Sequence, residues 1–492
     1  MSKNNDELFK NVIGHAKEYG FVFQSSEIYD GLSAVYDYGQ LGAELKNNLK
    51  TYWWKSMVQM NENIVGIDSA IFMHPKIWKA SGHVDGFADP MIDNKDSQKR
   101  YRADNLLEDK IARYEKDGKT EKAAKLQADM DEALSSDDLT RLKVLIEEHE
   151  IACPVSGTRN WTDVRQFNLM FSTQMGAMAE GSDEVYLRPE TAQGIFVNFL
   201  NVQKSGRMKI PFGIAQIGKA FRNEVIARQF IMRMREFEQM EMQFFVRPGT
   251  EMEWYQHWKQ ARLNWHLAVG TSPDKYRFHD HVKLAHYANA AVDIEFDFPF
   301  GFKEVEGIHS RTDFDLSQHQ QFSGKKMQYF DNELNEDGKP YGNYIPYVIE
   351  TSIGLDRMFL LTLCNAYEEQ DLSTEEKQDS RTVLRLHPTL APLKAAVLPL
   401  TKKDGLPEKA RDIMDKLKLD FNMQYDEKDS IGKRYRRQDA IGTPFCITID
   451  HQTLEDNTVT IRHRDSMEQE RVASDNLDQI IGNLVSWKNL IA

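Results

Sequence analysis

Apolar positions near the start of the chain recur at helical spacing. Over residues 44–60 they form one stripe, made of Leu45, Leu49, Trp53 and Met57. This spacing predicts a long amphipathic helix, because residues three and four apart share a face. An apolar run at 64–73 follows and predicts a strand that stops at Pro75, since proline has no backbone donor for a sheet.

Residues 95–150 carry many charges and almost no aromatic side chains. Their alanine, lysine and acidic content is typical of helices, and the spacing of leucine and isoleucine predicts an amphipathic helical hairpin. We interpret this segment as an insertion on a larger body. The predicted divisions are residues 1–94 as the first part of that body, 95–150 as the insertion, 151–387 as the main part with a linker, and 388–492 as a separate domain.

Between residues 151 and 365 short strands alternate with turns, and aromatic residues and glycines are frequent. This pattern predicts a large, mostly antiparallel sheet. The dipeptide Asp337-Gly338 predicts a hairpin within it, because aspartate and glycine adopt the backbone angles of tight hairpin turns. The polar stretch at 366–387 is predicted to be the linker.

After about Leu393 the pattern changes to strands that alternate with helices. A buried strand is predicted at 395–400, and Pro407 opens an amphipathic helix. Further strands are predicted at 421–425, 444–449 and 458–464, followed by a last helix capped by Ser474. The fold class predicted for the whole chain is α+β, with an antiparallel-sheet domain, a helical insertion and a C-terminal α/β domain.

The composition restricts the classes of partner and compartment. The 492 residues carry a formal net charge of −14, which argues against coating nucleic acid through the overall field but leaves room for a local basic patch. Three widely spaced cysteines make neither a disulfide framework nor a four-thiolate zinc site. No signal-peptide core and no run of 18 apolar residues occur, so we expect a soluble, cytoplasmic protein without a membrane partner.

One basic cluster stands out against this acidic background. Residues 428–437 carry five cations and one carboxylate. The cluster has two interpretations, a contact with nucleic acid or the solvated face of a helix.

Charged side chains also crowd the segments 221–224 and 233–241. Residues two apart share a face of a strand, so Arg222 and Glu224 are predicted to point the same way. On the second segment and its continuation, one face carries Phe237, Gln239, Glu241 and Gln243, and the other carries Met240, Met242, Phe244 and Val246. The apolar face predicts a core contact and the polar face a binding surface; a half-solvated sheet is the alternative.

Two further segments supply candidate ligands. Glu350 and Ser352 share a strand face, and Gly354 is predicted to let the chain turn into an apolar helix with Arg357 in its first turn. A helix N-terminus beside an arginine is a natural phosphate site, although a capped, buried helix with a surface arginine explains the pattern equally. Taken alone, Glu190 is more typical of a carboxylate at a helix start than of a ligand.

Taken in order, these motifs resemble the class II aminoacyl-tRNA synthetases. FRNE with the downstream RMREFEQME is similar to motif 2 of that class, GLDR at the helix start is similar to motif 3, and the helix and strand before Pro75 are similar to motif 1. RPETAQGIF, RYRAD and SIGKRYRRQDAIGTPF narrow the resemblance to the homodimeric glycyl type. It covers nearly the whole chain and implies a C-terminal anticodon-binding domain.

The resemblance implies a reaction and its partners. Glycine and ATP would form glycyl-adenylate and pyrophosphate with Mg²⁺ present, and glycine would then pass to the 3′ end of tRNA(Gly). The implied tRNA contacts are Lys433, Arg434, Arg436 and Arg437. Motif 1 implies a homodimer, and the stripe with Trp53 and Trp54 supports it, because so much apolar surface should not be exposed on one chain. No zinc is expected, since Cys153-Pro154 lacks the second cysteine found in some relatives.

Individual roles also follow from the resemblance. Arg222 would grip the α-phosphate and Arg357 the γ-phosphate, and both would be catalytic. Glu224 would read the adenine amino group, Phe237 would stack on adenine, and Glu304 would hold Mg²⁺. The implied ATP set is completed by Asn223, Met232, Arg233, Met234, Arg235, Glu236, Val305, Gly354, Leu355 and Asp356. The implied glycine set is Arg102, Glu190, Phe237, Glu238, Gln239, Met240, Glu241, Glu350, Thr351, Ser352, Ile353 and Gly354.

Physical reasoning is compatible with these roles. Glycine has no side chain to bind, so selectivity must come from excluding anything larger, and the amino acid carboxylate is already a nucleophile, so positioning and charge neutralisation would carry the rate. Three alternatives stay open. They are a synthetase for proline, threonine or histidine, a non-enzymatic relative of the same fold, and an ATP-dependent ligase that does not use tRNA.

Overall fold

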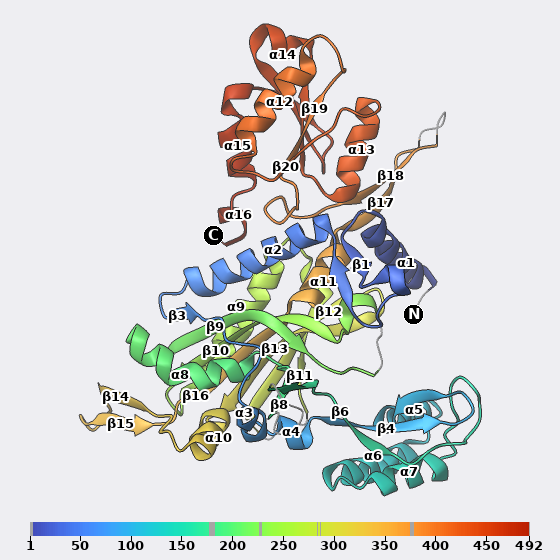
Figure 1. Ribbon diagram of the computed structural model, residues 1–492, viewed down its shortest axis with the longest axis vertical. Helices are drawn as coiled ribbons and strands as arrows, with labels where there is room; N and C mark the ends of the chain where they lie inside the picture. The colour runs from blue at the N-terminus through green and yellow to red at the C-terminus, as the bar shows by residue number, and fades with distance from the viewer. Residues whose placement is uncertain are drawn as a thin grey trace. The chain divides into compact units, whose positions relative to one another are not determined.

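The computed structural model describes residues 3–176, 183–225, 229–282, 284–285, 287–373 and 378–491. The chain forms two compact units, both drawn in Figure 1. The first unit consists of Met1–Ala70, Glu190–Lys219 and Gln229–Ala492, and the second consists of Ile71–Pro189 and Ala220–Arg228.

A seven-stranded sheet within the described residues is the centre of the first unit. Its strand order is β11 (Tyr276–Asp280), β12 (Ala290–Phe298), β13 (Gly301–Thr312), β16 (Tyr347–Gly354), β10 (Glu236–Val246), β9 (Phe212–Phe221) and β3 (Ile64–Gly66). The strands from β11 to β10 pair antiparallel, and β3 pairs parallel with β9. The predicted antiparallel sheet is confirmed, and Asp337-Gly338 does lie in a hairpin, between β14 (Tyr329–Leu334) and β15 (Pro340–Tyr344).

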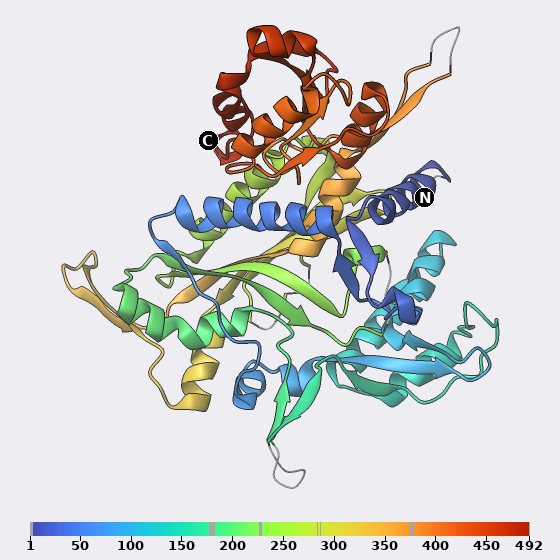
Figure 2. The ribbon, with the colours of Figure 1, turned by 45° about the horizontal axis from the view of Figure 1, so that its top comes forward.

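Helices cover both faces of this sheet (Figure 2). One face packs against α2 (Gln40–Trp54), α9 (Glu251–Leu267) and α11 (Leu355–Ala366), and the other packs against α8 (Ala192–Gly206) and α10 (Phe314–Ser323). Strand β10 shows why, because its side chains alternate between the faces. Met240, Met242 and Phe244 enter the first core, whereas Phe245 enters the second.

The predicted helix at 44–60 exists, but it begins earlier and its apolar stripe faces inward. Helix α2 starts at Gln40, and a π turn at Lys55–Gln59 follows it. Trp53 is fully buried in the core of its own chain, and Trp54 packs against the same core. The stripe is therefore not exposed, and the argument that it requires a second chain was wrong.

Other N-terminal predictions are corrected in part. The strand predicted at 64–73 is regular only over β3 (Ile64–Gly66), with a further isolated bridge from Phe72 to Leu187, and Pro75 begins a helix, α3 (Pro75–Ala80). Proline is well placed there, because its fixed φ suits the first helical turn. The chain starts with α1 (Lys3–Glu18), β1 (Val22–Gln24) and β2 (Tyr36–Tyr38).

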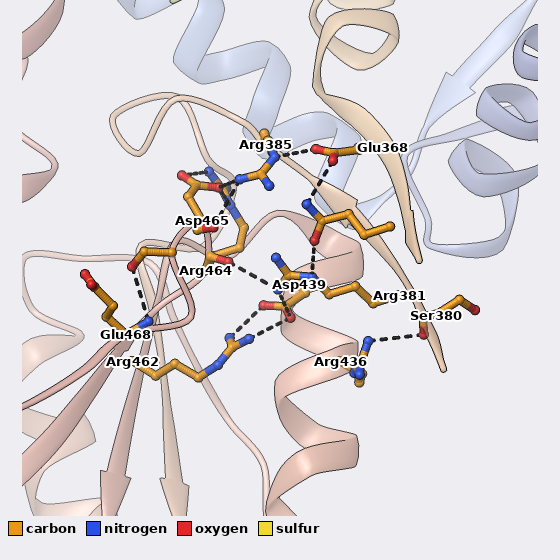
Figure 3. Close-up of polar contacts among 12 residues, drawn as sticks. Glu368, Ser380, Arg381, Arg385, Arg436, Asp439, Arg462, Arg464, Asp465 and Glu468 are labelled. Atoms are coloured by element: carbon orange, nitrogen blue, oxygen red, sulfur yellow. Dashed lines mark hydrogen bonds and ion pairs between the residues drawn. The ribbon is translucent and has the colours of Figure 1, made fainter. Parts of the chain in front are cut away.

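The predicted linker at 366–387 is instead a β-hairpin. Strands β17 (Tyr367–Asp371) and β18 (Ser380–Leu384) pair antiparallel, and residues 374–377 lie outside the described part. Arg381 on β18 donates to Asp439, 2.8 Å away, and the same buried carboxylate also accepts two bonds from Arg462 (Figure 3). A buried carboxylate between two arginines ties the hairpin to the domain that follows.

The C-terminal α/β pattern is confirmed in most of its elements. The strand order is β20 (Met423–Tyr425), β19 (Ala395–Pro399), β21 (Phe445–Ile449), β22 (Thr458–His463) and β23 (Gln469–Ala473). Helices α12 (Leu406–Leu417), α13 (Ile431–Ile441), α14 (His451–Asp456), α15 (Leu477–Leu484) and α16 (Lys488–Ile491) accompany them. Ser474 opens a 3-10 turn rather than capping α15, whose N-cap is Asn476.

In the second unit, a small sheet carries the charged insertion. The sheet order is β5 (Lys99–Arg102), β4 (Ala88–Asn94) and β6 (Arg165–Asn168). Three helices, not the predicted two, follow β5: α5 (Ala103–Lys116), α6 (Thr120–Ser135) and α7 (Leu139–Glu148). They enclose their own apolar core, which includes Leu107, Leu126 and Leu145. The unit also contains α3, α4 (His83–Gly86), β7 (Ser172–Met175) and β8 (Asp183–Tyr186).

Among the described residues, no helix has both the length and the apolar character that crossing a membrane requires.

Candidate functional site

The register of β10 with β16 builds a polar surface on the sheet. Glu241 lies opposite Ser352, and Gln243 lies opposite Glu350. The predicted face of alternating polar residues is therefore confirmed. Gln243 donates to Glu241 and to Glu350, with both distances 2.7 Å. Since Gln243 is buried and both carboxylates are nearly so, this is an interior polar network rather than a solvated sheet face.

Strand β13 adds residues that the sequence analysis missed. His309 lies opposite Glu350, and its Nδ1 is 2.9 Å from Glu350 Oε1. Arg311 donates to Glu350 at 2.9 Å and makes two bonds to Asp315. A period-two reading of 307–311 would have placed His309 and Arg311 on one face, but that segment carried no apolar alternation to mark it as a buried strand.

The carboxylates of this network titrate in opposite directions. Burial raises the pKa of Glu241 well above its usual value, and the neighbouring charges of Glu350 and Glu190 add to the shift. Burial also opposes ionisation of Glu350, yet the Arg311 guanidinium and the His309 hydrogen bond outweigh it and lower the pKa of Glu350 to about 2. When the pair holds one proton, that proton is therefore favoured on Glu241 rather than on Glu350.

The start of α8 supplies the rim of this network. Thr191 hydroxyl donates to Glu241, and the Thr191 backbone N–H donates to Gln239 Oε1 at 3.2 Å. Thr191 is the N-cap of α8, and Glu190 lies directly before it, at the helix start as predicted. Gln193, in the first turn of the helix, donates to Glu190 at 3.0 Å. A Cβ on Gly194 would lie 2.0 Å from Ser69 Oγ, and this contact explains a glycine in the helix.

The predicted phosphate arginine at the start of α11 contacts the predicted Mg²⁺ ligand. Arg357 Nη1 is 3.0 Å from Glu304 Oε2 and donates to the Glu304 carbonyl at 3.1 Å. Gly354 is the N-cap of α11, so the chain does turn into the helix at this residue, but its φ of −72° is one that any residue adopts. An added Cβ there would instead touch the Arg357 side chain at 3.4 Å.

The FRNE segment does not continue the strand. Strand β9 ends at Phe221, so the period-two argument that paired Arg222 with Glu224 was wrong. Within the second unit, Arg222 Nε donates to the Pro189 carbonyl at 3.0 Å, and its guanidinium lies 5.4 Å from the Phe87 ring centroid. The Asn223 N–H donates to the Leu169 carbonyl at 2.8 Å. These contacts hold the arginine in one orientation.

Several residues of the implied sets face the opposite side and pack into the core. Because β10 and β16 alternate, Glu238, Met240, Thr351 and Ile353 point away from Glu241 and Ser352. Glu238 instead pairs with Lys46 and Lys50, both at 2.7 Å. The buried side chains in this group are Met232, Met234, Met240, Val305, Thr351, Ile353 and Leu355. Because these side chains are buried, any contact with a ligand would be through the backbone, and their place in the implied sets stays a prediction.

The carboxylate of Asp356 is also occupied by hydrogen bonds within the protein. Its buried carboxylate accepts from Tyr38, from Lys46 at 2.8 Å and from the Glu238 backbone N–H at 2.8 Å. An ATP contact through this carboxylate would have to break the network, and the implied ATP role of Asp356 stays a prediction.

Other residues of the implied ATP and glycine sets lie on different elements of the two units. Glu236 pairs with Lys219 at 2.8 Å, and Arg235 donates to the Ser33 carbonyl at 3.0 Å. Phe237 is partly buried against the first core. In the second unit, Arg102 lies at the end of β5 and pairs with Asp89 at 3.0 Å and with Asp104.

The basic cluster lies on α13, and its arginines make hydrogen bonds and ion pairs within the chain. Arg434 is buried and donates to the carbonyls of Pro399, Asp426 and Leu400. Its implied tRNA contact is therefore corrected, because no phosphate reaches a buried guanidinium. Arg436 pairs with Asp379 at 2.9 Å, Arg437 pairs with Asp426 and Asp429, and Lys433 is exposed.

Comparisons with known proteins cover most of the chain. Residues 171–366 match the family described as tRNA synthetase class II core domain (G, H, P, S and T), residues 394–484 match Anticodon binding domain, and residues 89–127 and 119–169 match Glycyl-tRNA synthetase insertion domain 1. The chain is 54% identical to the glycine–tRNA ligase of Chlorobaculum tepidum over 94% of its own length and 96% of that protein. It is 53% identical to the glycine–tRNA ligase of Macrococcus caseolyticus, over 96% and 97% respectively.

Proposed function

We propose a function from one premise: this chain belongs to the glycine–tRNA ligase family, within the class II aminoacyl-tRNA synthetases. It is an enzyme that activates glycine with ATP and transfers it to tRNA(Gly). The observation that carries the choice of glycine is the buried acidic network of Glu241, Gln243 and Glu350 beside Ser352. Such a surface suits an ammonium ion, and its polar lining disfavours an apolar side chain.

The proposed activation step joins an oxygen of the glycine carboxylate to the α-phosphorus of ATP and releases pyrophosphate. Arg222 neutralises charge that develops at the α-phosphate, and Arg357 binds the γ-phosphate. Glu304 would hold Mg²⁺, which would supply positive charge at the phosphates; in the free protein this carboxylate pairs with Arg357 at 3.0 Å. Phe237 stacks on adenine and Glu224 reads its amino group. No protein base is required, because the carboxylate is already ionised.

The proposed glycine contacts are Glu190, Gln239, Glu241 and Ser352. Gln239 donates to Ser352 Oγ at 3.2 Å, which orients both groups on the face they share with Glu241. The ammonium would take the place of the proton on Glu241, where it meets a carboxylate in a buried setting.

In this proposal each part of the chain has its own function. Residues 1–94 and 151–387 activate glycine, residues 388–492 bind the anticodon, and residues 95–150 form the inserted domain. The exposed Lys433 on α13 is the proposed tRNA contact, with Arg436 and Arg437 beside it.

A pyrophosphate-exchange assay across the twenty amino acids tests the proposed function. Exchange with glycine alone, followed by charging of tRNA(Gly) by the same preparation, is the expected result. Exchange with proline, threonine or histidine, no exchange with any amino acid, or exchange without tRNA charging would each support one of the alternatives and overturn the proposal.

Glycine binding is expected to release a proton. The raised pKa of Glu241 favours its protonated form in the free protein. The glycine ammonium requires the carboxylate, so affinity should improve as pH rises and level off above the pKa of free Glu241. Calorimetry in buffers of different ionisation enthalpy should show a heat that depends on the buffer. A heat that is equal in all buffers would contradict this assignment, and Glu241→Gln should bind weakly without releasing a proton.

We also propose a homodimer, a cytoplasmic location and Mg²⁺ dependence. The dimer now rests on the resemblance of motif 1 alone, because Trp53 is buried within its own chain. Light scattering at micromolar concentration should give twice the 57.0 kDa chain mass, and a fully active monomer would refute the dimer. Activity that sediments with membranes, or that survives removal of Mg²⁺, would refute the other two proposals.

A further inference from the structure

Two histidines and an aspartate meet beside the acidic network, on three neighbouring strands. His281 directly follows β11, Asp293 lies on β12, and His309 lies on β13. One ligand atom from each lies within 4.8 Å of the other two. His281 Nε2 and Asp293 Oδ2 are already 2.9 Å apart, and the His281 and His309 rings have centroids 5.7 Å apart.

The orientation of His309 is fixed by its outer partner. Its Nδ1 is 2.9 Å from Glu350 Oε1, and a carboxylate accepts hydrogen bonds, so Nδ1 carries the proton. In the neutral ring Nε2 then presents a lone pair. That nitrogen is buried and has no hydrogen-bond partner among the described residues. A carboxylate behind a histidine in this manner is the usual outer support of a metal-binding imidazole.

Space at the cluster is kept open by a glycine. Gly307 lies opposite Asp293 in the sheet, on the same strand as His309. A Cβ at Gly307 would lie 3.2 Å from the His309 ring and 3.6 Å from Asp293 Oδ1. Any larger side chain would therefore press between two of the three ligand groups.

We propose that His281, Asp293 and His309 form a binding site for a divalent transition-metal ion, with Zn²⁺ the best match. Two imidazole nitrogens and one carboxylate oxygen, with further positions open to water, suit zinc, whereas Mg²⁺ prefers an all-oxygen set. This proposal revises the expectation of no zinc, which considered cysteines alone.

The ion would tighten the cluster by a small movement. Ligand atoms around a tetrahedral zinc, each about 2 Å from the ion, lie roughly 3.3 Å apart. Atoms that now lie within 4.8 Å reach that spacing by side-chain rotation. The ion would also restrain Glu350, which accepts from Gln243 and Arg311. The protein should therefore melt at a higher temperature with one equivalent of Zn²⁺.

Metal titration of the full chain tests the site directly. Metal-free protein in excess Mg²⁺ would be titrated with Zn²⁺ by calorimetry and with Co²⁺ by visible absorption. One ion per chain is expected. His281→Ala and Asp293→Asn should each weaken affinity by at least about tenfold, since even outer partners of metal sites contribute that much.

Two control variants distinguish this site from other sources of binding. His451→Ala removes an exposed histidine whose Nε2 is 3.1 Å from Asp404, a pair that belongs to no cluster of three possible metal ligands among the described residues. Cys153→Ser removes a buried thiol. Both should bind as the parent protein does. Absence of stoichiometric binding, binding unchanged in His281→Ala and Asp293→Asn, or binding lost in Cys153→Ser would overturn the proposal. Circular dichroism of each variant checks that it is folded.

Discussion

Replacing Arg222 by alanine should lower glycine-dependent ATP–pyrophosphate exchange by about 10²–10³-fold, because a donor aimed at developing charge contributes roughly 3–4 kcal/mol. The Pro189 carbonyl and the Phe87 ring already hold the guanidinium in place. Its orientation therefore needs little reorganisation when ATP binds. The loss should appear in kcat more than in KM for glycine, since Arg222 is proposed to act on the phosphate and not on the amino acid.

An arginine elsewhere in the same unit provides the matched control. Arg159 is exposed and pairs with Glu150 at 2.7 Å. Arg159→Ala removes the same charge and should leave exchange unchanged. If Arg222→Ala exchanges pyrophosphate at the parent rate, the proposed activation mechanism is wrong, whereas an equal loss in both variants would indicate a general effect of net charge.

Alternation along strands was the most reliable guide to the site. It predicted correctly that Glu241 and Gln243 share a face of β10 and that Glu350 and Ser352 share a face of β16. Neighbouring strands in an antiparallel sheet must then bring these faces together. The same rule places the side chains of Met240 and Ile353 in the core, so any contact that they make with glycine would be through the backbone.

The sequence pattern does not show which groups each side chain contacts. The apolar stripe on α2 was identified correctly. Periodicity does not say whether the surface that covers such a stripe belongs to the same chain, and Trp53 is in fact buried within its own chain. The end of β9 at Phe221 likewise depends on hydrogen bonds to distant backbone, such as that from the Phe221 N–H to the Arg188 carbonyl. Arg311 was missed because a buried charged residue differs from a surface one only in its partners.

In the basic helix α13, too, the partners of the side chains could not be predicted from the sequence. One of these partnerships leads to a large expected effect on stability. Arg434→Ala should destabilise the C-terminal domain by about 3 kcal/mol, because the guanidinium donates to three carbonyls in the interior and its loss leaves them without those bonds. Urea denaturation followed by circular dichroism measures this change. Aminoacylation should fall at temperatures where that domain unfolds, for a reason unrelated to phosphate contact.

Lys433→Glu is the matched comparison one residue away. Lys433 is exposed on α13, so its charge reversal should leave the unfolding midpoint unchanged, raise KM for tRNA and flatten the salt dependence of tRNA binding. Glycine-dependent exchange should stay at the parent level, since that reaction needs no tRNA. An Arg434→Ala protein as stable as the parent but weakened in tRNA binding would restore Arg434 as a direct contact. A Lys433→Glu protein that charges tRNA normally would leave α13 as a structural helix, because its other cations already pair within the chain.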